Sequence, residues 1–288
     1  MRVLLLGANG QLGSDILRLW HDPAVTVIPA IRADADVTDG AELTRLVAAA
    51  LPDVVVNTTA FHNLPQAEAD PETCFRVNVL GGWNVARAAR TSGAAVVQVS
   101  TDYVFAGTKR SPYLEDDPRR SLNVYGSAKI ATEDLVRQAN PESLIVRVSG
   151  LYGLAGSAGK GGNFVETMLR LAQEGSPIRV VSDQVTAPTN TAEIAEALLP
   201  VVRDGLRGTI HIAASGSCSW HEFAAAIFEI AGLHPNLQAV TTAEFAAPLQ
   251  RPMYSVLGTT RVPALAAWRA GLERYMREKH PDGAPTSG

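Results

Sequence analysis

The sequence predicts an α/β protein built on a doubly wound parallel sheet, with a smaller lobe formed by the second half of the chain. Short, continuously apolar segments recur along residues 1–150, which is the pattern of strands buried on both faces. Segments with helical periodicity separate them, and the first apolar segment runs directly into a glycine-rich turn. Strands that alternate with helices in this way pack as a parallel sheet with helices on both faces.

Composition narrows the class of protein further. The 288 residues are 46% hydrophobic, and the mean hydropathy of +0.05 is that of a globular protein with an ample core. A net charge of -4 argues against a nucleic-acid groove or a basic membrane surface, and no segment is long enough to span a bilayer. Cys74 and Cys218 form neither a disulfide framework nor a metal site, and the six histidines lack ligand spacing. We therefore expect a cytoplasmic protein with no catalytic metal.

The first strand, residues 2–6, leads into a turn of G-x-x-G-x-x-G spacing and then a helix over 14–20. Glycines let such a turn approach a pyrophosphate, which binds the free amides at the helix start. The alternative is a plain strand-to-helix turn. The order of strand, turn and helix favours a Rossmann-type, NAD(P)-binding domain over residues 1–150. Its expected cofactor-binding residues are Gly7, Asn9, Gly10, Gln11, Leu12 and Gly13.

The second strand, residues 25–31, ends beside charged residues that bear on cofactor choice. An acid usually reads the ribose at this point, but Arg32 comes first, and Asp34 and Asp36 follow. Arg32 favours a 2′-phosphate and hence NADP(H), while Asp34 keeps NAD(H) possible. The alternative for Arg32 is an exposed loop charge. Thr38 or Asp39 is expected to cap a helix over 40–50.

Polar clusters follow the later strands, which are expected at residues 54–57, 96–99 and 144–148. Long helices are expected over 74–92 and 123–139, and the alternation predicts a sheet of six strands. In open parallel sheets, ligands gather at the carboxyl ends of the strands. Residues 58–61, 100–103 and 149–153 should therefore line the site.

Tyr125 and Lys129 lie four residues apart, on one face of the expected helix. A phenol is a weak acid, and a nearby ammonium stabilises the phenolate, so the pair can exchange a proton with a substrate oxygen. A tyrosine and a lysine on a solvated helix face are the alternative.

After Gly153 the pattern changes to short and scattered elements. We expect a glycine-rich loop over 156–162, Asn163 as a helix cap, and a disordered tail over 281–288. Residues 151–280 are interpreted as a substrate-binding lobe, interleaved with the first domain and without an independent core. The expected elements are strands at 178–181 and 209–212 and helices at 164–174, 191–202, 219–231 and 263–279.

Several motifs occur in an order that resembles the dTDP-4-dehydrorhamnose reductase family of extended short-chain dehydrogenase/reductases. The resemblance covers nearly all of residues 1–280. The motifs are the glycine turn, Ser100-Thr101-Asp102-Tyr103-Val104-Phe105, Tyr125-x-x-x-Lys129, Gly162-Asn163-Phe164-Val165, Asp183-Gln184 with Pro188-Thr189, and Arg251-Pro252.

The resemblance implies hydride transfer from NADPH or NADH to the C4 ketone of a nucleotide-linked 6-deoxy sugar, and a possible homodimer. Tyr125 would donate the proton. Lys129 would bind the nicotinamide ribose and depress the tyrosine pKa, and Thr101 would polarise the carbonyl. Asp36, Val37, Ala60 and Phe61 match further cofactor contacts. The implied substrate-binding residues are Thr101, Asp102, Tyr103, Gly150, Asn163, Gln184 and Arg251.

Arg251 could clamp a diphosphate, or could be a plain surface arginine. Two departures from the family concern the sugar: Pro65-Gln66 replaces an acidic-basic pair, and Gly150 replaces a tryptophan. A dehydratase would need a second carboxylate after Thr101 and Asp102, where Tyr103 stands, and an epimerase is a lesser alternative. A non-catalytic, NADP-binding regulatory subunit, similar to the β subunit of methionine adenosyltransferase, is the alternative of a different class.

Overall fold

The computed structural model describes residues 1–156, 162–245 and 249–281. Most of the expected glycine-rich loop and of the expected disordered tail lies outside the described residues.

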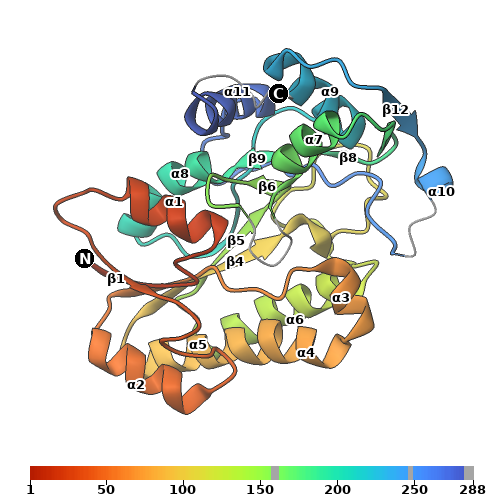
Figure 1. Cartoon of the computed structure of the whole chain (residues 1–288). Coiled ribbons are helices and arrows are strands. Elements are labelled where there is room, and N and C mark those ends of the chain that lie inside the picture. Colours follow the sequence, from red (N-terminus) through yellow and green to blue (C-terminus); the bar gives the residue numbers. More distant parts are fainter. Residues whose placement is uncertain (157–161, 246–248, 282–288) are drawn as a thin grey trace.

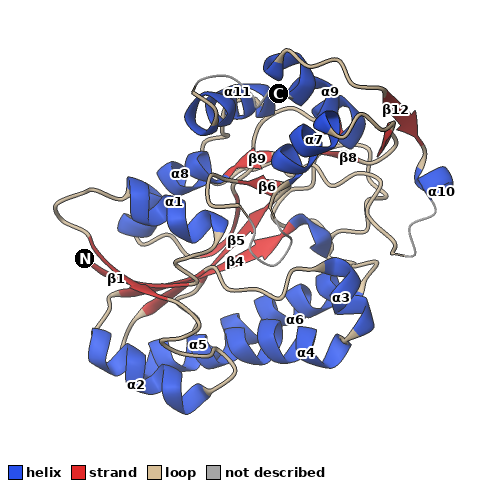
Figure 2. Cartoon of the chain, in the orientation of Figure 1, coloured by secondary structure: helices blue, strands red, loops and turns tan. Residues whose placement is uncertain are grey.

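A six-stranded parallel sheet forms the centre of the molecule (Figures 1 and 2). Its order is β10-β5-β4-β3-β1-β2, and each neighbouring pair is parallel. The prediction of a doubly wound parallel sheet is confirmed. One strand was misplaced: a strand expected at 209–212 was assigned to the smaller lobe, but it is Gly208–His211 and pairs with β5 at the edge of the main sheet. The strands are β1 (Arg2–Leu6), β2 (Thr26–Ala30), β3 (Val54–Asn57), β4 (Ala95–Thr101), β5 (Leu144–Val148) and β10 (Gly208–His211).

Helices cover both faces of this sheet (Figure 1). Along β1, Val3 and Leu5 point into one apolar cluster while Leu4 and Leu6 point into the other, as the two-residue period of a strand requires. The first cluster is closed by α1 (Gln11–Leu19) and α8 (Thr191–Arg203), and the second by α2 (Gly40–Ala50) and α5 (Gly81–Thr91). Burial on both faces explains the continuous apolar segments.

The helix expected over 74–92 is present, but it is not a uniform α-helix. After α3 (Leu64–Ala69), helix α4 (Pro71–Phe75) passes into a π-helical turn, Arg76–Leu80, before α5 begins. Such turns carry an extra residue and often mark functional sites. Next, α6 (Val124–Ala139) begins where predicted, because the Asn123 side chain accepts a hydrogen bond from the Gly126 amide.

The second half adds a smaller lobe with its own apolar cluster, so the expectation that it lacks an independent core was wrong. Tyr152, Val165, Phe223 and Leu272 are among the buried residues of this cluster. The lobe's elements include α7 (Phe164–Gln173), α9 (Trp220–Ala231), α10 (Thr242–Phe245), and β7 (Ile178–Val181) paired with β12 (Leu237–Val240). Two short ladders accompany them, β6 (Leu151–Tyr152) with β9 (Thr189–Asn190), and β8 (Val185–Thr186) with β11 (Cys218–Ser219).

The last helix, α11 (Trp268–Lys279), begins five residues after the predicted start at Pro263. The backbone before it pairs with Ser215 instead: the Ser215 amide donates to the Ala266 carbonyl, and the Trp268 amide donates to the Ser215 carbonyl. A partner distant in sequence therefore delays the helix.

Candidate active site

The glycine-rich turn forms a close junction between β1 and α1. Gly7 has a φ of +79°, and a Cβ at Gly13 would lie 2.3 Å from the Gly7 carbonyl oxygen, so both positions need glycine. Gly10 is the N-cap of α1 and has no side chain to cap it. The first amides of α1 are therefore suited to a pyrophosphate.

Of the other turn residues, Asn9 is exposed, whereas Leu12 is buried in the core and can offer a ligand only its backbone. The Gln11 side chain accepts a hydrogen bond from the Gly153 amide at 3.1 Å. Gln11 thereby ties the turn to the chain that follows β5.

At the end of β2, Arg32 and Asp36 form an exposed pair. The Arg32 side chain is 88% exposed, and its Nη2 lies 3.0 Å from an Asp36 carboxylate oxygen. The Thr38 amide and hydroxyl, together with Arg32, hold the pKa of Asp36 below its ordinary value. Val37 is buried and lies against Gly81, the first residue of α5. Arg32 thus follows β2, which pairs with β1, and β1 is the strand that leads into the glycine-rich turn.

The Ala60–Phe61 segment after β3 is held by a residue that was not predicted. Asn78, in the π-helical turn, accepts from the Phe61 amide at 3.0 Å and donates to the Phe61 carbonyl at 3.1 Å. Asn78 is only 3% exposed. Its role depends on the irregular turn, which helical periodicity does not reveal.

Tyr125 and Lys129 lie on the first two turns of α6. Lys129 is 2% exposed, and its Nζ donates to the Val99 carbonyl of β4 at 2.7 Å. Burial lowers the pKa of Lys129 to about 8, against the opposing charge of Glu133. Burial, and then the Asp102 carboxyl, raise the pKa of Tyr125. This is opposite to the expected depression, because burial disfavours the charged phenolate.

Thr101 and Asp102 belong to a buried cluster of hydroxyl groups. The Thr101 hydroxyl donates to Asp102 at 3.0 Å, and the Ser149 hydroxyl donates to the other Asp102 oxygen at 2.9 Å. Ser149 and Ser255 each contact the Thr186 hydroxyl. Burial raises the pKa of Asp102, against these hydrogen bonds. The structure brings Thr101 next to Tyr125. Ser149 lies in the segment expected to line the site, whereas Thr186 and Ser255 were missed because they are far apart in sequence.

Tyr103 and Arg251 meet beside this cluster. The Tyr103 ring lies 6.0 Å from the Tyr125 ring in an edge-on arrangement, and its phenol is within hydrogen-bonding reach of Arg251. Burial raises the pKa of Tyr103 to about 12. The guanidinium of Arg251 therefore lies next to Tyr103, and its predicted role in anion binding stays a prediction.

Three other predicted residues have structural partners in the lobe. Asn163 caps α7 and donates to the Gly153 carbonyl and the Tyr275 hydroxyl, and Gln184 donates to Thr242. Gly150 has a φ of +54°, and a Cβ there would lie 3.0 Å from Pro188. The backbone at Gly150 thus disfavours any residue with a side chain.

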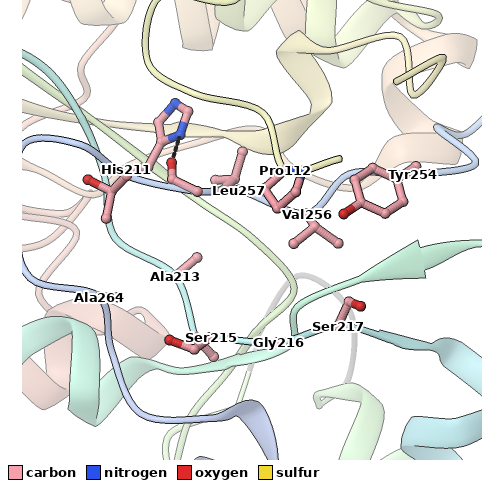
Figure 3. Close-up of a pocket in the computed structure, with 13 residues that line it drawn as sticks. Pro112, His211, Ala213, Ser215, Gly216, Ser217, Tyr254, Val256, Leu257 and Ala264 are labelled. Atoms are coloured by element: carbon pink, nitrogen blue, oxygen red, sulfur yellow. Dashed lines mark hydrogen bonds between the residues drawn. The ribbon is translucent and has the colours of Figure 1, made fainter. Parts of the chain in front are cut away.

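A cavity of about 280 Å³ lies where the chain leaves β10 (Figure 3). His211, Ser215 and Tyr254 are on its wall, and none of the predicted catalytic residues lines it. Tyr254 and Val256 face this cavity, while Ser255 between them contacts Thr186. The cavity therefore lies behind the 254–256 segment rather than in the predicted site.

A helix start with free amides suited to an anion, and a partly buried tyrosine with a buried lysine next to a threonine at the strand ends, are the features of a nicotinamide-dependent oxidoreductase of the short-chain type. Comparison with known proteins places the chain more narrowly. The model of the RmlD substrate binding domain family matches residues 1–280. The spore coat polysaccharide biosynthesis protein SpsK of Bacillus subtilis is 37% identical, and the alignment covers 96% of this chain and 98% of that protein.

The dTDP-4-dehydrorhamnose reductase of Salmonella typhimurium is 34% identical over 96% of this chain and 98% of that protein. A crystal structure of the Bacillus anthracis dTDP-4-dehydrorhamnose reductase in complex with NADP superposes with a TM-score of 0.91, at 35% identity, over 96% of this chain and 99% of that one. The chain belongs to the RmlD family of dTDP-4-dehydrorhamnose reductases and is a nicotinamide-dependent oxidoreductase that reduces a sugar nucleotide. Among the described residues, none of the helices is both long and apolar enough to cross a membrane.

Proposed function

We propose that the protein reduces the C4 ketone of a nucleotide-linked 4-keto-6-deoxy sugar, dTDP-4-dehydrorhamnose or a related deoxysugar. The observation that carries the proposal is that Thr101, at the end of β4, lies next to Tyr125 of α6, while Lys129 of the same helix donates to Val99 of the same strand. The nicotinamide would supply the hydride when bound. Residues 1–150 would bind the cofactor, and residues 151–280 would contribute the substrate lobe.

Tyr125 is suited to donate the proton that the new hydroxyl requires. Because burial raises its pKa, the phenol is protonated at neutral pH and ready to donate. Thr101 would hydrogen-bond the ketone oxygen once its single hydroxyl proton, which Asp102 accepts in this structure, turns toward that oxygen. Lys129, one helical turn after Tyr125 on α6, would bind the nicotinamide ribose.

The pairing of Arg251 with Tyr103 supports a diphosphate contact, because a guanidinium binds phosphate oxygens in a bidentate manner. The two departures from the family, Gly150 and Pro65-Gln66, favour a related or repositioned sugar. A cytoplasmic location and a homodimer are part of the same proposal. Cys74 and Cys218 are both free and buried, which fits a reducing compartment.

NADPH is the proposed preferred cofactor, and Arg32 is the residue that would select it. Replacing Arg32 with alanine is expected to raise the KM for NADPH roughly tenfold or more, the effect of one lost charge-assisted hydrogen bond, with little change for NADH. Steady-state kinetics with both cofactors would measure this difference. Arg45→Ala is a matched control, because Arg45 is an exposed arginine on α2. Equal losses with NADPH and NADH would contradict the assignment.

The proposed function is tested by NADPH oxidation with dTDP-4-keto-6-deoxy-L-mannose, beside a short panel of other nucleotide-linked 4-keto sugars. Turnover of one member establishes the reaction and its sugar. Tight NADPH binding without turnover of any member would contradict the proposal and would favour the regulatory subunit.

A further inference from the structure

Two consecutive links fasten α6 to the end of β4. Lys129 donates to the Val99 carbonyl at 2.7 Å, and one helical turn later Glu133 accepts from the Ser100 hydroxyl at 2.6 Å. Val99 and Ser100 directly precede Thr101. The helix face that carries Tyr125 is therefore held in register with the strand end that carries Thr101.

Glu133 is a buried charge with good partners. Its side chain is 0% exposed, and Arg147 of β5 binds both carboxylate oxygens, at 2.9 and 2.8 Å. Arg119 adds a contact at 3.1 Å from the surface side. Burial opposes ionisation, but the hydrogen bonds and charge of Arg147 prevail and lower the pKa of Glu133. Glu133 is therefore an anion at neutral pH.

The network is also fixed at its far end. Arg147 donates to the Glu115 carbonyl at 3.0 Å and faces His211 Nε2 at 3.2 Å. Burial and the charge of Arg147 lower the pKa of His211, so Nε2 accepts from Arg147 and the Nδ1 proton points to the Gly258 carbonyl, 2.7 Å away (Figure 3). Arg147 thus has defined partners on both sides and cannot easily shift away from Glu133.

A buried ion pair is weak evidence of a contribution to stability, because apolar residues of similar volume often serve as well. We propose that Glu133 is a positioning residue for the reduction: it holds Tyr125 and Lys129 against Thr101 and is the counter-charge of Lys129. The proposal rests on the proposed function. The groups that face Lys129 are the Glu133 carboxylate of its own helix, the Cys74 thiol of α4 and the Val99 carbonyl of β4. Without Glu133, burial would lower the pKa of Lys129 further.

The first test is Ser100→Ala, which removes one link and leaves the Glu133–Arg147 pair intact. We expect kcat to fall by up to about 10²-fold, the cost of a displacement of roughly 1 Å, with a smaller change in KM. Ser143→Ala is the matched control, because the Ser143 hydroxyl is buried without a hydrogen-bond partner among the described residues. Wild-type kcat in Ser100→Ala would overturn the positioning role.

The second test is Glu133→Gln, which keeps the shape and removes the charge. NADPH affinity, followed by fluorescence, should weaken in the wild type as pH rises through about 8, where Lys129 loses its proton. In Glu133→Gln this midpoint should move to lower pH. A lower melting temperature with an unmoved midpoint would leave only a structural role and overturn the proposal.

A failure of the proposed function can be distinguished from a failure of the positioning role of Glu133. If no keto sugar is reduced by the wild type, the proposed function fails, but the pH midpoint of NADPH binding still decides the role of Glu133. If Glu133→Gln does not fold, because Arg147 is left unpaired, the kcat of Ser100→Ala relative to Ser143→Ala decides it.

Discussion

Replacing Tyr125 with phenylalanine is expected to lower kcat by roughly 10²–10⁴-fold, the usual contribution of a positioned proton donor. The ring would remain in place, packed edge-on against Tyr103. Only the hydroxyl near Thr101 would be lost, so cofactor affinity and melting temperature should stay close to those of the wild type. Steady-state assays of keto-sugar reduction would measure the loss of kcat, and parallel binding measurements would show that NADPH affinity is unchanged.

Tyr113→Phe is the matched control for that variant. Tyr113 is a buried tyrosine whose ring stacks on Phe105 and whose hydroxyl accepts from the Lys109 amide at 3.1 Å, outside the proposed site. Its kcat should be unchanged. Comparable losses in the two variants, or a Tyr125→Phe enzyme of wild-type rate, would contradict the assignment of Tyr125 as proton donor.

Gly13→Ala is expected to have the second large effect, on cofactor binding and on stability together. A Cβ there would meet the Gly7 carbonyl oxygen at 2.3 Å and Ala8 Cα at 2.9 Å, both backbone atoms. The α1 start must then move away from β1, which should cost about 1–3 kcal/mol, as overpacking commonly does. Titration with NADPH and thermal unfolding would record both losses.

Gly10→Ala separates the two effects. Gly10 has a φ of -79°, which alanine adopts without strain, and the nearest contact of its Cβ is the Gly7 oxygen at 3.3 Å. The variant should fold with nearly wild-type stability and yet bind NADPH weakly, because the methyl group occupies the approach to the amides of α1. Unchanged NADPH affinity in Gly10→Ala would place the pyrophosphate elsewhere.

The main sheet was largely predictable because its signal is local. The boundaries of Val54–Asn57 and Leu144–Val148 were predicted to the residue, since strands buried on both faces are continuously apolar between polar ends. The helix caps at Asp39, Asn123 and Asn163 depend on neighbouring residues in the same way. Where strand, turn or cap chemistry decides the structure, a short window of sequence contains the cause.

The parts that escaped prediction depend on partners distant in sequence. Thr186 and Ser255 meet Ser149 near Asp102 only through the fold, and the Glu133–Arg147 pair joins α6 to β5. The raised pKa of Tyr125 also escaped prediction. Its main cause is burial, which depends on the fold and not on the neighbouring residues in the sequence. The motifs were enough to propose the residues of the site. They did not reveal the hydrogen bonds and ion pairs that hold these residues in place.

Transfer of deuterium from NADPH deuterated at the reactive carbon of the nicotinamide would test the reduction of the C4 ketone at its key step. The protein is incubated with the labelled cofactor and a nucleotide-linked 4-keto-6-deoxy sugar, and the product is examined by NMR. We expect deuterium on C4 of the sugar, with one configuration at that carbon. An unchanged sugar, or a product with deuterium at another carbon, would contradict a 4-ketoreductase.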